Sequence, residues 1–214
     1  MAFCTRHRQR GGMTTRFNQK QYLGRTLLVL LSIWVLAVLA APGIPSPIQT
    51  PSEEYGVKAA FLFRFSQFVD WPPDVFQDAD APLNFCTIGL DPFKGALEGT
   101  LAGKKIGTHP ARVLHFQSGQ VVTACHMLFI GADLGPYAAK LLVSLQDSPI
   151  ATIGDTDHFA QQGGLIGFCW ENEKIRFEVN LNVAARAKLR ISARLLSLAK
   201  SVIGGTKGTA NVPS

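Results

Sequence analysis

Residues 165–179 have the sequence Leu-Ile-Gly-Phe-Cys-Trp-Glu-Asn-Glu-Lys-Ile-Arg-Phe-Glu-Val, and this stretch decides the fold. Two apolar runs, 165–170 and 174–179, flank the polar segment Glu171-Asn172-Glu173. That segment is too short for the crossover that joins parallel strands. The two runs are therefore predicted to form an antiparallel hairpin.

Upstream of this hairpin, short apolar runs alternate with segments of helical periodicity. Strands are predicted near 83–89, 111–116, 126–131 and 149–154, and helices near 93–101, 134–146, 156–161 and 182–203. Such alternation is typical of a parallel sheet with helices on both faces. We therefore predict an α/β fold, a three-layer sandwich with a mainly parallel sheet and a C-terminal antiparallel hairpin.

A first helix is predicted over residues 53–69, with Ser52 as its cap and Trp71-Pro72-Pro73 as its stop. Apolar residues that recur at helical spacing along it are expected to face the core: Val57, Phe61, Phe65 and Phe68. Phe63 lies opposite that stripe. An aromatic side chain in this position is a candidate contact for a partner protein.

The net charge of +6 is concentrated at the N-terminus. The first 40 residues hold six Lys and Arg residues and no acid, whereas residues 41–214 hold 15 Lys and Arg and 15 Asp and Glu. The larger part of the chain has no basic excess that would attract phosphates. We therefore expect no nucleic-acid partner.

The N-terminal segment has the features of a secretory signal peptide: a basic start, an apolar run at 27–39 and small residues at Ala40-Ala41. The alternative is an uncleaved membrane anchor, although the run is shorter than the roughly 17–25 residues that a spanning helix needs. The predicted organisation is a signal peptide at 1–40, a Pro-rich linker at 41–52, an α/β domain at 53–203 and a flexible tail at 204–214.

Three cysteines follow the predicted signal peptide. Because disulfides persist in the compartments to which proteins are exported, one bridge and one unpaired thiol is the simplest arrangement. Neighbouring strands could bring Cys86 and Cys125 together, whereas Cys169 belongs to a run predicted to be a buried strand. The alternative is a metal site of these cysteines with His115 and His126, although none of them shows the close spacing typical of metal ligands.

Three predicted strands are followed by an acidic residue: Asp91, Asp133 and Asp155. Ligands bind at the carboxyl edge of open α/β sheets, so these acids could line a ligand crevice. The simpler interpretation is helix capping, since each acid precedes a predicted helix. The sequence has no Gly-rich phosphate loop, no nucleophile elbow and no zinc-protease motif. We predict neither catalysis nor a cofactor, and no metal.

The predicted C-terminal helix carries an arginine at every fourth position, at Arg186, Arg190 and Arg194. That spacing would place the three guanidinium groups on one face. The simpler interpretation is a solvated face near a helix C-terminus, where cations are favoured. The alternative is a binding surface for an acidic partner or an anion.

Several motifs resemble those of the YfiR-like bacterial periplasmic proteins and follow that family's order over about residues 53–203. They include Glu54-Tyr55-Gly56-Val57-Lys58-Ala59-Ala60-Phe61-Leu62-Phe63-Arg64-Phe65, Phe68-Val69-Asp70-Trp71-Pro72, Cys86-Thr87-Ile88-Gly89-Leu90-Asp91-Pro92-Phe93, Cys125-His126-Met127-Leu128-Phe129-Ile130 and Lys174-Ile175-Arg176-Phe177-Glu178-Val179-Asn180. Several ordered motifs over this length are far more specific than any one of them.

The resemblance implies a periplasmic regulatory domain without catalysis. Its namesake represses an inner-membrane diguanylate cyclase by binding the periplasmic sensor domain of that enzyme, and an OmpA-like outer-membrane lipoprotein sequesters it. The resemblance also implies that Cys86 and Cys125 form the family's disulfide, whereas Cys169 has no partner for a second one. We therefore expect a repressor in cyclic-di-GMP signalling that acts by protein contact and could form a homodimer. The alternative function is that of a periplasmic receptor that binds a small anion.

Overall fold

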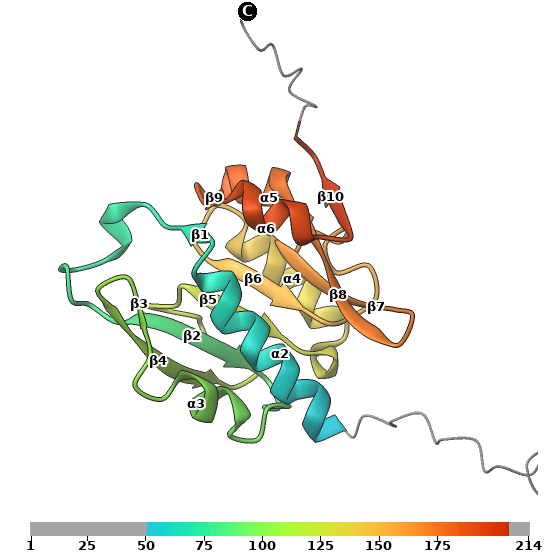
Figure 1. Ribbon diagram of the computed structural model, residues 1–214, viewed down its shortest axis with the longest axis horizontal. Helices are drawn as coiled ribbons and strands as arrows, with labels where there is room; N and C mark the ends of the chain where they lie inside the picture. The colour runs from blue at the N-terminus through green and yellow to red at the C-terminus, as the bar shows by residue number, and fades with distance from the viewer. Residues whose placement is uncertain (1–50, 206–214) are drawn as a thin grey trace, which may run out of the picture. The chain divides into compact units, whose positions relative to one another are not determined.

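The computed structural model describes residues 51–205, which form an eight-stranded sheet in the order β10-β8-β7-β6-β5-β2-β4-β3 (Figure 1). The strands are β2 (Leu83–Ile88), β3 (Lys105–Ile106), β4 (His109–Phe116), β5 (Met127–Ile130), β6 (Ala151–Gly154), β7 (Ile166–Glu171), β8 (Lys174–Asn180) and β10 (Ser201–Ile203). Neighbours in this sheet are parallel except in the β7–β8 hairpin and the β3–β4 edge pair. The predicted mainly parallel sheet and the antiparallel hairpin are confirmed.

Helices cover both faces of the sheet, which gives the predicted three layers. On one face lie α2 (Pro51–Ser66), α3 (Ala96–Leu101), α5 (Leu181–Arg186) and α6 (Ala193–Leu198), and on the other lies α4 (Pro136–Leu145). Side chains of a strand alternate between the faces. Phe129 of β5 therefore packs in the α2 layer, whereas its neighbours Leu128 and Ile130 pack against Leu141 and Leu142 of α4.

The buried stripe of helix α2 only partly matches the prediction: Phe65 is buried and Phe61 and Phe68 pack, partly buried, against the core as predicted. Val57 is 40% exposed, whereas Ala59, Leu62 and Phe65 are buried. The prediction followed the aromatic residues and omitted Ala59 and Leu62, whose spacing defines the buried stripe. Phe63 is partly buried and packs against the core, so its ring does not stand clear in solvent opposite the stripe.

The predicted helix at 182–203 is wrong, because this segment forms α5, β9 (Arg190–Ile191), α6 and β10. Helix α5 ends where Lys188 adopts a positive φ of 56° and the Leu189 N–H donates to the Ala184 carbonyl. This is the hydrogen-bond pattern of a Schellman motif. Ser192 then starts α6, because its side chain accepts the Leu195 N–H.

The predicted helix at 156–161 is also absent, since turns occupy that segment. Phe159 is 2% exposed and its ring lies against Gly154 and Gly164, where any Cβ would collide with it. A buried aromatic residue in this short connection holds the turn against the sheet.

Two further observations concern the organisation of the chain. Within residues 51–205, no helix combines the length and apolar character needed to cross a membrane. The predicted signal peptide, nearly all of the predicted linker and the tail after Gly205 lie outside the described residues.

Candidate functional site

The three predicted crevice acids follow adjacent strands of the sheet. Asp91 lies beyond β2, Asp133 beyond β5 and Asp155 beyond β6, and these strands are neighbours and parallel. The carboxyl ends of parallel strands meet at one edge. The structure therefore brings the three acids to the same edge of the sheet, although each has a different environment.

Asp155 forms a buried ion pair with Lys58 of α2. The Lys58 Nζ lies 2.6 Å from the Asp155 Oδ2, and the two side chains are only 4% and 6% exposed. The Lys58 Nζ also lies 2.5 Å from the Glu54 Oε1, and the Tyr55 hydroxyl donates to the Asp155 Oδ2 over 2.8 Å. Lys58 and Tyr55 thus link the first two turns of α2 to the Asp155 carboxylate at the end of β6, and Glu54 is a second carboxylate beside the same cation.

The polar contacts around Asp155 are incomplete. Its Oδ1 is buried and has no hydrogen-bond partner among the described residues. The same carboxylate lines a small cavity of about 240 Å³ beside Phe168, Cys169 and Trp170. The pKa of Tyr55 is strongly raised, first by burial and then by its hydrogen bond to Asp155. The phenol therefore remains a proton donor to this carboxylate at all ordinary pH values.

Lys58 was missed as a site residue in the analysis of the sequence. A signal for it was present, because Lys58 interrupts an otherwise apolar helix face and follows Glu54 at the i,i+4 spacing of a helical ion pair. Its partner Asp155 is 97 residues away, and the local pattern holds no information on that contact.

Asp133 and Asp91 make local contacts. The Asp133 Oδ2 accepts the Leu90 N–H over 2.9 Å, and the Asp91 Oδ1 accepts the Phe93 N–H over 3.1 Å. Neither caps a helix, since α3 begins after Gly95 and α4 after Gly135, both without a side-chain cap. The capping interpretation of these two acids is therefore wrong, although their hydrogen bonds do order the loops at this edge.

Asp91 also belongs to a cluster with Glu98 of α3 and His115 of β4. One potential ligand atom of each residue lies within 4.8 Å of the others. The alternative metal site of the sequence analysis, with His115, His126 and the cysteines, is not formed. Cys86 and Cys125 are joined in a disulfide, and His126 precedes β5 at the opposite edge of the sheet.

The Cys86–Cys125 disulfide confirms the implied pairing. It connects residues 39 apart in the sequence, and both cysteines are buried in the α4 layer. Cys169 is the free thiol among the described residues, as expected, but it is only partly buried. Burial still raises the pKa of its thiol, which opposes formation of a reactive thiolate.

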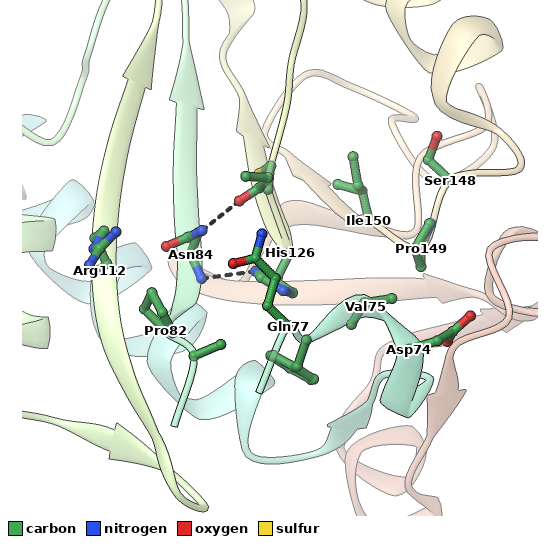
Figure 2. A pocket seen from close by; sticks show the side chains of 14 residues that line it. Asp74, Val75, Gln77, Pro82, Asn84, Arg112, His126, Ser148, Pro149 and Ile150 are labelled. Atoms are coloured by element: carbon green, nitrogen blue, oxygen red, sulfur yellow. Dashed lines mark hydrogen bonds between the residues drawn. The ribbon is translucent and has the colours of Figure 1, made fainter. Parts of the chain in front are cut away.

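A larger cavity, of about 540 Å³, lies at the amino edge, where β2, β5 and β6 begin (Figure 2). Asn84 donates its side-chain N–H to the Ala124 carbonyl and its backbone N–H to the His126 Nδ1 (Figure 2). The ring of Phe76 stacks on both His126 and His109, with centroid distances of 4.8 and 3.8 Å. Burial lowers the pKa of His126, which favours the neutral form of this ring.

The three arginines predicted to share one helix face are all exposed but do not lie on one helix. Arg186 ends α5, Arg190 lies in β9 and Arg194 lies in α6. Strand β9 pairs with β1 (Val69–Asp70), and the Arg190 guanidinium lies 3.6 Å from the Asp70 carboxylate. The Arg194 guanidinium lies 5.9 Å from the centre of the Phe68 ring. We call Arg186, Arg190 and Arg194 the arginine patch.

Known proteins that this chain resembles include one family and a crystal structure of low sequence identity. The profile of the YfiR/HmsC-like family matches residues 55–200, about two thirds of the chain. A crystal structure of a conserved domain protein from Vibrio cholerae is similar to 56% of this chain, with a TM-score of 0.45 and 7% sequence identity. The matched region covers 54% of the Vibrio chain, about half of its length.

Proposed function

The chain belongs to the YfiR/HmsC-like family, known in general as periplasmic regulators, and we propose that it represses an inner-membrane diguanylate cyclase in cyclic-di-GMP signalling. It acts by contact with the periplasmic sensor domain of the cyclase and not by chemistry. An OmpA-like outer-membrane lipoprotein is the proposed antagonist, which sequesters the repressor. The family match, which covers nearly all of the described domain, carries this proposal.

The disulfide supports action in the periplasm. Cys86 and Cys125 are both buried and bonded to each other, and bridges of this kind persist in oxidising compartments. The predicted signal peptide supports the same location.

The arginine patch supports contact with an acidic surface. Its three guanidinium groups are exposed, and the side chain of Arg190 is 85% exposed although it lies near Asp70. An exposed pair of this kind contributes little to folding, so Arg190 remains free to bind a carboxylate of a partner. Phe63, being partly buried, contributes at most the rim of a contact or of a homodimer interface.

The alternative of an anion receptor has less support. The carboxyl edge presents Glu54, Asp91, Asp133 and Asp155, and its buried cation, Lys58, already contacts two of these carboxylates. A small anion in this crevice would be repelled by the remaining negative charge.

The proposal is tested by deleting the gene and measuring cellular cyclic-di-GMP. Deletion should raise the cyclic-di-GMP concentration, and the wild-type gene on a plasmid should restore it. The double variant Arg190→Ala/Arg194→Ala should be exported and folded but should not restore repression. A matched control, Lys105→Ala/Lys140→Ala, removes the same charge from exposed positions elsewhere and should repress normally. Unchanged cyclic-di-GMP after deletion would reject the function, and full repression by the arginine variant would reject the patch as the contact surface.

A further inference from the structure

Three elements bring a histidine and two carboxylates together near the carboxyl edge. Asp91 follows β2, His115 lies near the end of β4, and Glu98 projects from α3. Their potential ligand atoms lie within 4.8 Å of one another. The shortest contact joins the His115 Nε2 to the Glu98 Oε1, at 2.6 Å. The cluster is separate from the Lys58–Asp155 ion pair and does not depend on the proposed function.

The ring of His115 is held by a buried side chain. Thr87 lies beside it in register on the neighbouring strand β2 and is 1% exposed. Its Oγ1 lies 2.7 Å from the His115 Nδ1. A second hydrogen bond at the other ring nitrogen is typical of histidines that bind metals, because it fixes both the ring orientation and the tautomer. In the tautomer with the proton on Nδ1, the Nε2 atom that lies 2.6 Å from the Glu98 Oε1 has a lone pair free to bind a metal ion.

The carboxylates have capacity for a further positive charge. The Glu98 Oε2 is shielded from solvent and has no hydrogen-bond partner among the described residues. Among residues 51–205, Asp91 accepts one hydrogen bond, from the Phe93 N–H to its Oδ1. A buried carboxylate oxygen without a donor or cation is costly, and a bound metal ion would remove that cost.

We propose that Asp91, Glu98 and His115 bind a divalent transition-metal ion, with zinc as the best fit. One imidazole nitrogen and two carboxylate oxygens match the ligand types of zinc, whereas calcium and magnesium prefer oxygen ligands alone. Three protein ligands leave a fourth position, and the exposed side of the cluster gives water access to it. The ion replaces the proton between His115 and Glu98 and joins β2, β4 and α3.

The test is a calorimetric titration of the untagged, EDTA-stripped protein with zinc chloride. We expect one ion per chain, and at least a tenfold weaker affinity for His115→Ala and for Glu98→Gln. The control His158→Asn removes another exposed histidine, at a positive-φ position that asparagine tolerates, and should leave the affinity unchanged. Cobalt should give visible absorption bands in the wild type that are lost in His115→Ala.

The possible outcomes separate the proposal from its rivals. Equal zinc affinity for the wild type, His115→Ala and Glu98→Gln would overturn it, as would the absence of binding. Magnesium or calcium that displaces zinc at similar concentration would overturn the assignment of the metal class. Circular dichroism of each variant verifies that a lost affinity does not come from a lost fold. Because the side chains of His115 and Glu98 are 48% and 42% exposed and lie outside the hydrophobic core, these substitutions should leave the fold intact.

Discussion

Replacement of Lys58 by methionine should destabilise the protein strongly, because it leaves a charge buried without its partner. The Lys58 and Asp155 side chains are 4% and 6% exposed, so solvent compensates poorly for the lost cation. The Asp155 Oδ2 would keep only the Tyr55 hydroxyl, and its Oδ1 already has no partner among the described residues. Glu54, which shares the same ammonium group, would add a second uncompensated carboxylate.

The magnitude follows from the burial of the pair. Removal of one partner of a buried ion pair costs about 3–5 kcal/mol, against a total stability of about 5–15 kcal/mol for a domain. The double variant Lys58→Met/Asp155→Asn also removes the buried charge of Asp155 and leaves only Glu54, whose side chain is 23% exposed, so it should recover at least half of the loss. Methionine keeps the length of the lysine side chain, so most of the packing is retained.

Urea unfolding at pH 7, followed by circular dichroism, measures these free energies. The control Lys140→Met replaces an exposed lysine on α4 and should change the free energy of unfolding by less than about 0.5 kcal/mol. A loss of under about 1 kcal/mol for Lys58→Met would refute the reasoning. A double variant no more stable than Lys58→Met would show that the loss comes from packing and not from the orphaned charge.

Three further outcomes are expected. Phe65→Ala should lower the free energy of unfolding in urea by about 3–5 kcal/mol, because Phe65 is 1% exposed. Phe63→Ala should lower it clearly less, because the Phe63 ring is only partly buried. Equal losses for the two variants would contradict this difference in burial. Reduction of the Cys86–Cys125 disulfide, which links residues 39 apart, should lower the free energy of unfolding by about 4 kcal/mol; peptide mapping under non-reducing conditions that finds another pairing would contradict it. Burial lowers the pKa of His126 below the usual 6.5, so as the pH falls the imidazole is protonated more readily in the unfolded chain than in the folded one. The free energy of unfolding should therefore decrease as the pH drops below about 6.5. The variant His126→Gln should flatten that part of the pH profile, and an unchanged slope would exclude His126 as the cause of the pH dependence.

Much of the fold follows from local patterns in the sequence. The polar segment in residues 165–179 is too short for a crossover and produces the β7–β8 hairpin, and strands lie where apolar runs predict them. The three crevice acids reach one edge because parallel strands end together. Resemblance to a family supplied the disulfide pairing, which no local pattern determines.

The segment 182–203 shows where local pattern fails. Its periodicity favours one helix, but a positive φ at Lys188 and the cap at Ser192 break it into short elements. This break turns Leu189 and Leu195 into the core beside α2. Burial of these side chains decides the conformation, and local helical propensity is too weak to oppose it.

The sites depend still more on tertiary structure. Asp155 meets Lys58 across 97 residues, and His115 meets Glu98 only because α3 packs beside β4. By itself the sequence determined which residue types follow each strand. The order of the strands and the packing of the helices decided which of these residues meet, because a contact between distant segments depends on the whole sheet and leaves no periodic signal in either segment.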